Sequence, residues 1–348
     1  MSSGWHLIGQ DNVVTYLARS LKAGALSHAY LLSAPENSGK TTLAIKLAQV
    51  LNCIGVMIDG APCEECEPCR RIAERQHSDV QIINIYTGNE SGKSRVELSI
   101  EQVRGVTHAA SMPPYEGRYR VFIIEDAEKL STGAANALLK TLEEPSPQVL
   151  FVLTTSKENQ LPETVRSRCV KLRLAAAPRT EISRFLEDEL GFTASRADLL
   201  SRLSQGRAGW AIMAAKEESV LDERRDNLDR FFEAIEGSYD GRFDLAAKLA
   251  QRFSQKRDEV YRLLEQWLFL ARDILLQKLD ITDGIINTDY EIPVAGLAER
   301  LSITEIRSLI GSLAGTLQHL EQNASARLAL EVLMLSMPLP GGSLKKSG

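Results

Sequence analysis

Residues 34–41 read Ala34-Pro35-Glu36-Asn37-Ser38-Gly39-Lys40-Thr41, and this octapeptide sets the class of fold that we expect. It fits the phosphate-binding pattern G-x-x-x-x-G-K-T/S at every position except the first, where Ala34 replaces glycine. An apolar run at residues 29–32 precedes it, and Leu43, Leu47 and Leu51 follow it at helical spacing. Because a P-loop works in the order strand, loop, helix, the sequence predicts nucleotide-binding ancestry.

The loop residues have separate predicted roles in holding ATP or ADP with Mg²⁺. Backbone N–H groups and the positive end of the following helix would surround the phosphate oxygens. Lys40 would reach the β- and γ-phosphates, and the Thr41 hydroxyl would ligate Mg²⁺. Since Ala34 alters the first turn, binding by the present chain stays open, and the alternative is a solvated lysine at a helix start. The predicted nucleotide site comprises Ala34, Asn37, Ser38, Gly39, Lys40, Thr41 and Thr42.

An acidic pair follows a second apolar run, at residues 121–124. P-loop ATPases usually carry Asp for the metal and then Glu for the attacking water, whereas this chain has Glu125 and then Asp126. We expect Glu125 to serve the metal. Asp126 stands in the base position with a shorter side chain, and a base must lie within hydrogen-bond distance of its proton, so we expect weak or absent hydrolysis. The equally weighted alternative is that both acids favour a helix N-terminus.

Four of the five cysteines lie close together, directly after the predicted P-loop helix. Their spacing, C-x9-C-x2-C-x2-C, lets thiolates converge on one tetrahedral ion, and Zn²⁺ is the natural ion for a closed four-cysteine site. The alternative is four free core thiols, but the glutamates at residues 64–67 are poor core companions. We therefore expect a structural zinc site formed by Cys53, Cys63, Cys66 and Cys69, with Cys169 elsewhere in the core.

Composition narrows the class of protein. The chain has 348 residues, enough for two or three domains. Its 41 Lys and Arg against 46 Asp and Glu give a net charge of −5, which argues against a protein that coats nucleic acid unaided. No apolar run approaches the ~18 residues of a membrane span, and the N-terminal residues lack the features of a signal peptide. We expect a cytoplasmic protein with no membrane partner.

The order of patterns predicts how the chain divides. Apolar runs recur at residues 80–85, 120–124, 149–154 and 170–174 with helical patterns between them, which indicates a parallel sheet covered by helices. We expect this α/β domain over residues 1–174, with the cysteine insertion at 53–69. Helical patterns then predict a small lid at 175–213 and a larger all-helical domain at 214–338. Residues 339–348 are expected to be disordered.

Several longer strings carry a family resemblance. His28-Ala29-Tyr30-Leu31-Leu32 leads into the P-loop, and the four-cysteine insertion follows the P-loop helix. Residues 136–145 read Asn-Ala-Leu-Leu-Lys-Thr-Leu-Glu-Glu-Pro, and residues 161–169 read Leu-Pro-Glu-Thr-Val-Arg-Ser-Arg-Cys. In order and spacing, these motifs resemble those of bacterial clamp-loader subunits of the AAA+ class. The resemblance is specific over residues 8–213 and only architectural beyond them.

The resemblance implies roles for further residues. Thr155 occupies the sensor place beside the γ-phosphate. Arg168 matches the arginine that reaches the ATP of a neighbouring subunit, although a solvated charge at a helix end is the simpler alternative. Gly209 stands where the motor subunits carry a second, nucleotide-sensing arginine. Together with Ala34 and the reversed acidic pair, Gly209 is the third departure at one composite site, and all three point away from a motor.

The chain is most similar to the delta-prime type of DNA polymerase III subunit, with the ATP-hydrolysing gamma/tau type as the close alternative. The resemblance implies a P-loop domain, a helical lid and a helical collar that joins other subunits. Implied partners are gamma/tau and delta subunits, primed DNA within the assembly and, indirectly, the sliding clamp. An autonomous ATPase and a zinc-dependent nucleic-acid reader are the rival classes. The three departures disfavour the first, and the Glu-rich cysteine segment disfavours the second.

Overall fold

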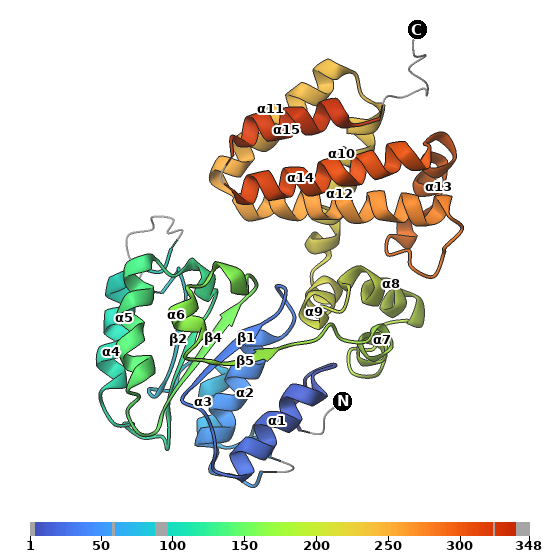
Figure 1. The fold of residues 1–348 in the computed structure, drawn as a ribbon. Helices are drawn as coiled ribbons and strands as arrows, with labels where there is room; N and C mark the ends of the chain where they lie inside the picture. Colours follow the sequence, from blue (N-terminus) through green and yellow to red (C-terminus); the bar gives the residue numbers. More distant parts are fainter. Residues whose placement is uncertain (1–3, 58–59, 88–96, 323, 339–348) are drawn as a thin grey trace. The chain divides into compact units, whose positions relative to one another are not determined.

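The computed structural model describes residues 4–57, 60–87, 97–322 and 324–338. The chain forms two compact units, Met1–Ala197 with Ser204–Ala211 and Asp198–Leu203 with Ile212–Gly348, and each is described by itself (Figure 1). The three-part division at residues 174 and 213 stays a prediction. The tail for which we expect disorder, residues 339–348, lies outside the described residues.

The first unit is built on a parallel sheet with strand order β2-β3-β4-β1-β5. Every apolar run that the sequence analysis assigned to a strand forms one, so the predicted α/β class is confirmed. The strands are β1 (Ala29–Ser33), β2 (Val80–Ile83), β3 (Arg120–Ile124), β4 (Val149–Thr155) and β5 (Val170–Arg173).

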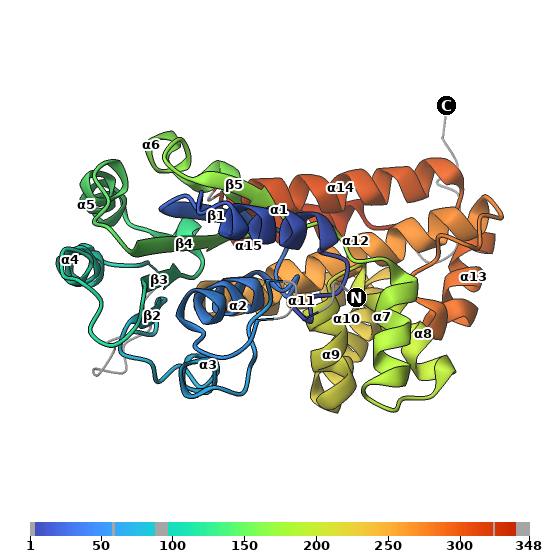
Figure 2. The same ribbon diagram turned by 90° about the horizontal axis from the view of Figure 1, so that it is seen from below.

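Helices cover both faces of this sheet (Figures 1 and 2). Successive strand residues point to opposite faces, so each strand feeds two hydrophobic cores. Tyr30 and Leu32 belong to the core under one helical layer, whereas Leu31 belongs to the other. The first layer holds α1 (Asp11–Lys22), α2 (Lys40–Asn52) and α3 (Glu67–Ala73), and the second holds α4 (Ile100–Ala110), α5 (Thr132–Glu143) and α6 (Glu163–Arg166). Short 3₁₀ turns, η1 (Ala127–Lys129) and η2 (Glu158–Gln160), follow β3 and β4.

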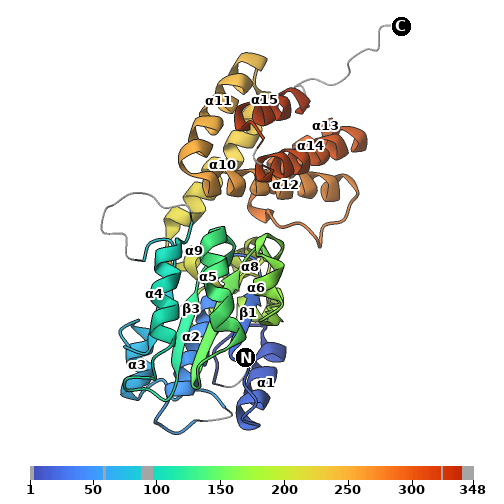
Figure 3. The same ribbon diagram turned by 60° about the vertical axis from the view of Figure 1, so that its left-hand side comes forward.

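The C-terminal half is helical, as expected. After α7 (Arg179–Asp188) come α8 (Ala194–Ser204) and α9 (Ala208–Lys216), and each of these two helices has residues in both units. In the second unit α11 packs on α15 and α12 packs on α14 (Figure 3). Its elements are α10 (Glu218–Glu236), α11 (Tyr239–Gln255), α12 (Arg257–Lys278), η3 (Thr288–Tyr290), α13 (Glu291–Arg300), α14 (Ile303–Glu321) and α15 (Ala326–Ser336). None of the helices that the model describes is long and apolar enough to cross a membrane.

The second unit has a large core, and hydrogen bonds from two buried residues fix its helices. Trp267 of α12 is fully buried and donates its indole N–H to the Asn227 carbonyl at 2.7 Å. The buried Arg242 guanidinium donates to the Ile235 carbonyl at 2.9 Å and to the Met337 carbonyl at 3.0 Å. These contacts tie α11 to residues at the ends of α10 and α15.

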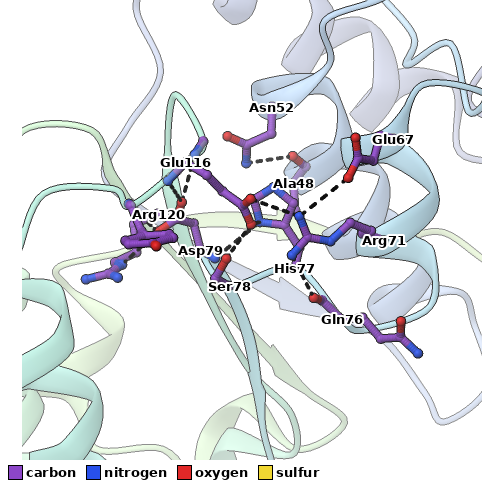
Figure 4. Close-up of polar contacts among 12 residues, drawn as sticks. Ala48, Asn52, Glu67, Arg71, Gln76, His77, Ser78, Asp79, Glu116 and Arg120 are labelled. Atoms are coloured by element: carbon purple, nitrogen blue, oxygen red, sulfur yellow. Dashed lines mark hydrogen bonds and ion pairs between the residues drawn. The ribbon is translucent and has the colours of Figure 1, made fainter.

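The loop before β3 is held by side chains on both of its sides (Figure 4). The Asp79 carboxylate accepts hydrogen bonds from the backbone N–H groups of residues 115, 116 and 117, each at 2.8 Å. Asn52, the last residue of α2, accepts from the next two N–H groups at 2.9 and 3.0 Å. Glu116 also pairs with Arg71 of α3 at 2.9 Å. The loop is thereby fixed to the sheet, to α2 and to the cysteine segment.

The Asp79 carboxylate is fully buried, and its titration supports a pH-dependent prediction. Burial opposes its ionisation, but the three backbone N–H groups and Arg120 outweigh that effect and lower the pKa of Asp79 below its ordinary value. A lowered pKa in the folded state stabilises the fold above the unfolded-state pKa of about 4, and this stabilisation is lost as the pH falls through the folded-state value.

We therefore expect Asp79→Asn to lower the free energy of unfolding at pH 7 by about 2–3 kcal/mol. The difference from wild type should shrink at pH 3. Urea denaturation at both pH values measures this, with the exposed Asp188→Asn on α7 as a control that changes stability by less than about 0.5 kcal/mol. An equal difference at pH 7 and pH 3 would contradict the prediction.

Candidate functional site

The predicted nucleotide residues meet at the carboxyl edge of the sheet. Strand β1 ends at Ser33 and continues into the P-loop, β4 ends at Thr155, and β3 is followed by Glu125. Because β4 lies between β1 and β3, Thr155 stands between the loop and the acid. The Ala34 N–H donates to the Thr155 carbonyl at 3.2 Å, which ties the loop to this edge. Ligands of open parallel sheets bind at such edges.

The P-loop holds its own lysine. Gly39 has φ +89°, a left-handed conformation that suits glycine, and it places Lys40 as the first residue of α2. The Lys40 ammonium is 8% exposed and donates to the carbonyls of Ala34 at 2.7 Å and Pro35 at 2.8 Å. Burial lowers the pKa of Lys40, while attraction to Glu128, Asp126 and Glu36 opposes the shift. The lysine charge therefore lies inside the loop that would surround a phosphate.

The structure brings the two predicted magnesium residues together. The Thr41 hydroxyl donates to one oxygen of Glu125 at 2.9 Å, and the Asn84 amide donates to its other oxygen at 2.9 Å. Asp126 has φ +50° and pairs with Lys129 at 3.3 Å. Asn84, which follows β2, was not identified from the sequence, because only the strand order places it beside Glu125. The roles of Glu125 and Asp126 toward a metal and a water stay predictions.

A half-buried glutamate that the sequence analysis did not assign lies at the same edge. Glu128 accepts from the Ser156 backbone N–H at 3.0 Å and from the Ser156 hydroxyl at 2.6 Å. Burial opposes its ionisation, but the hydrogen bonds from Ser156 and Thr155 keep the pKa of Glu128 below its ordinary value. Its other oxygen is buried without a hydrogen-bond partner among the described residues. Glu128 therefore adds a negative charge to the field around Lys40.

Helix α9 comes very close to the P-loop. A Cβ placed on Gly209 would lie 2.7 Å from the carbonyl oxygen of Asn37, closer than real Cβ contacts. Asn37 itself has φ +57°, a left-handed backbone conformation. Gly209 is the place at which the resemblance implies an arginine in motor subunits. The present backbone leaves no room there for any side chain.

Arg168 lies in the segment after α6 and is held by the end of α5. Its Nε donates to Glu143 at 2.9 Å, a second nitrogen also contacts Glu143, and a third donates to the Thr164 carbonyl at 2.8 Å. The guanidinium is about one third exposed. Arg168 thus has a fixed direction, while its role toward a neighbouring subunit stays a prediction.

The four predicted cysteines form one cluster. Their sulfur atoms all lie within 4.8 Å of one another, a spacing that can hold a metal ion. Cys53 directly follows α2, while Cys66 precedes α3 and Cys69 lies within it. A Cβ at Gly55 would lie 2.6 Å from the Cys63 sulfur, so this glycine makes room for the cluster. Although burial opposes it, backbone and thiol hydrogen bonds lower the pKa of Cys66 to about 6.

Cys169 is separate from this cluster. It is buried in the core on the α4 and α5 side of the sheet, as predicted. Burial raises its pKa to about 12, so this thiol stays protonated at neutral pH.

Fold and site together define a P-loop protein built on a parallel α/β sheet. Residues 9–178 match the protein-family model described as DNA polymerase III, delta subunit. The matched residues include all five strands of the parallel sheet.

Comparison with curated proteins finds relatives that are named as subunits of DNA polymerase III. The chain is 35% identical to DNA polymerase III subunit tau of Escherichia coli (strain K12) over 361 residues, covering 96% of this chain and 54% of the relative. It is 34% identical to subunit tau/gamma of Haemophilus influenzae over 224 residues, covering 63% of this chain and 31% of the relative. The chain thus spans about a third to a half of the length of these relatives.

Among solved structures, the chain is similar to a DNA polymerase III gamma subunit-related protein from Thermotoga maritima. The TM-score is 0.44 at 18% identity, and the match covers 92% of this chain and 97% of that one.

The close approach of α9 to the P-loop leads to a stability prediction. We expect Gly209→Ala to lower the free energy of unfolding by about 1–3 kcal/mol, because the new methyl group would press on the Asn37 carbonyl. Gly105, inside α4, has open space around its Cβ position and is the matched control. Gly105→Ala should raise stability by about 0.5–1 kcal/mol through helix propensity. Urea denaturation compares the two variants, and a stabilised Gly209→Ala protein would contradict the close approach.

Proposed function

We propose that this chain is a clamp-loader subunit of DNA polymerase III, of the delta-prime type, which helps load the sliding clamp onto primed DNA. In this proposal it supplies Arg168 to the ATP site of a neighbouring subunit and is itself weak or inactive in hydrolysis. The observation that carries the proposal is a contrast within one domain. The chain's own nucleotide site has Gly209 where the resemblance implies a nucleotide-sensing arginine in motor subunits. Arg168, in contrast, is held in a fixed, partly exposed position by Glu143.

Besides Gly209, two features support a weak nucleotide site in the chain itself. Ala34 replaces the first P-loop glycine, and its carbonyl accepts a hydrogen bond from Lys40. Asp126, in the predicted base position, is paired with Lys129. Losses in a phosphoryl-transfer site are severe because positioning and charge stabilisation act together. ATP or ADP with Mg²⁺ would be held by the P-loop, Thr41, Glu125 and Thr155, and the nucleotide would supply the phosphates that these groups surround.

The chemistry of Arg168 suits action on a neighbour. A guanidinium is permanently charged and holds two phosphate oxygens at once, so it stabilises charge that develops on a γ-phosphate. In the chain on its own, the Glu143 carboxylate forms an ion pair with this guanidinium. A phosphate from another subunit would compete with this carboxylate for the arginine.

An exposed apolar stripe supports assembly with other subunits. Leu328, Val332 and Leu335 lie on one face of α15 and are each more than half exposed. Residues at this spacing share a helix face, and exposed apolar faces mark protein interfaces. We infer that the helical domain joins gamma/tau and delta subunits in a collar, in the cytoplasm, with primed DNA and the sliding clamp bound by the assembly.

The alternative function is an ATP-hydrolysing motor of the gamma/tau type. Two observations favour it. The curated relatives carry tau and gamma names, and Thr41 is hydrogen bonded to Glu125 as a magnesium site requires. ATP turnover by the isolated chain separates the two candidates: we expect less than about one per second, the low end of typical enzyme rates. Faster turnover without partners would support the motor.

The cysteine cluster leads to a metal prediction, with Zn²⁺ as the proposed ion. We expect one zinc per chain in protein purified without chelators, because a closed four-thiolate site binds zinc with an apparent free energy on the order of 10 kcal/mol or more. Elemental analysis measures it. The double variant Cys63→Ser and Cys66→Ser should lose the zinc and melt at a lower temperature. The control Cys169→Ala should keep it, and less than about half an equivalent in wild type would contradict a zinc site.

Arg168 leads to a prediction for the reconstituted assembly. We expect Arg168→Ala to reduce DNA-dependent ATP turnover in part and to reduce clamp loading. An arginine finger contributes about 10³–10⁵ in rate at its own site, and only one of several sites loses it. Arg168→Lys should not restore activity, because an ammonium lacks the planar pair of donors.

Arg173→Ala, a more exposed arginine on the nearby strand β5, is the matched control and should leave turnover and loading unchanged. Size-exclusion chromatography establishes that each variant still assembles. Wild-type turnover and loading by assembled Arg168→Ala would show that Arg168 is a surface charge.

A further inference from the structure

A large cavity lies at the amino edge of the sheet, opposite the P-loop edge. Its volume is about 1170 Å³, comparable to the upper end of the ~300–1,000 Å³ usual for ligand pockets. It runs along α1 and is bordered by the end of α2, by the segment before β1 and by the segments that enter β3 and β4, and it is partly open to solvent. All of these elements belong to the first unit.

The cavity walls are fixed by hydrogen bonds. Arg118 and Tyr119 line the cavity, and Asn52 accepts from the backbone N–H groups of both. The wall before β4 is held by the Gln148 carbonyl, which accepts from the Arg120 N–H at 2.8 Å. At the start of β1, the Ser27 N–H donates to the Tyr30 hydroxyl at 3.0 Å. A cavity with fixed walls loses little conformational entropy when a ligand binds.

The lining combines an apolar interior with a positive rim. Apolar side chains from α1, α2 and β4 line it, including Val14, Leu51 and Leu150. Arg19, Lys22 and Arg118 also line it, against one carboxylate, that of Asp11. In the described part of the chain none of these three cations has an ion-pair partner, so a positive rim stands on a protein of net charge −5.

Two residues of the wall carry buried nitrogens that lack hydrogen bonds. The indole Nε1 of the fully buried Trp5 and Nε2 of His28 have no partner among the residues that the structure describes. Both residues line the cavity. A buried polar group without a partner is costly, so the inner wall has unused hydrogen-bonding capacity.

We propose that this cavity is a binding site for a small organic anion with an aromatic or aliphatic body, separate from the nucleotide site. The body packs against the apolar lining, and the acidic group contacts the cations at the rim. The third feature of the ligand, after its body and its acidic group, is a hydrogen-bonding group that lies near the inner wall. The positive rim distinguishes this ligand from a neutral apolar molecule of the same shape.

The test uses two fluorescent probes with the full chain. The anion 8-anilino-1-naphthalenesulfonate should bind at one saturable site per chain, and the neutral N-phenyl-1-naphthylamine should bind the same site more weakly. Thr15→Trp places a large side chain on the cavity wall from an exposed position of α1 and should weaken both probes at least tenfold. Lys22→Glu should lower the affinity for the anionic probe about tenfold, since it removes a charge contact. It should change the affinity for the neutral probe less than twofold.

Arg104 on α4, on the other face of the sheet, provides the matched controls. Arg104→Trp and Arg104→Glu should bind both probes as wild type does, and circular dichroism establishes that every variant is folded. Absence of saturable binding, or unchanged binding by Thr15→Trp, would overturn the site. Equal weakening of both probes by Lys22→Glu would overturn the preference for an anion.

Discussion

The parallel pairing of β1 with β4 is the constraint on which the rest of the first unit depends. This register sets Ser33 opposite Thr155, so the P-loop begins at the level where β4 ends. Since β3 pairs with the other side of β4, Glu125 arrives at the same edge. Thr41 and Glu125, 84 residues apart in the chain, thus meet although β1 and β3 do not pair with each other. A shift of one residue in this register would send alternate side chains to the wrong core.

The amino edge of the sheet is organised by different means. In the residues that the structure describes, its order comes from buried carboxylate and amide oxygens. Asp79 and Asn52 together accept five consecutive backbone N–H groups, which replaces regular secondary structure in that loop. Asn52 is also the residue before Cys53, so the loop, the P-loop helix and the cysteine cluster share one short stretch of chain. The two edges of the sheet are therefore connected through the length of α2.

Much of this fold could be predicted from the sequence because it depends on local patterns. Apolar runs gave all the strands, and leucine spacing gave the P-loop helix. The cysteine cluster was also predictable, since its spacing brings the sulfurs together. The contacts of Asn84, Glu128 and Glu143 were not, because each depends on a partner that only the strand order or helix packing places nearby. Polar residues after strands and at helix ends are common, and nothing in their own neighbourhood distinguishes these three.

The approach of Gly209 to Asn37 has an evolutionary consequence. In this backbone a side chain at residue 209 requires that α9 withdraw from the P-loop, since the obstacle is a main-chain carbonyl that cannot rotate away. A change of this codon to one for a larger residue is therefore tolerated only together with a change in the helix or in the loop. Residue 209 and the position of α9 are thus expected to change together in evolution.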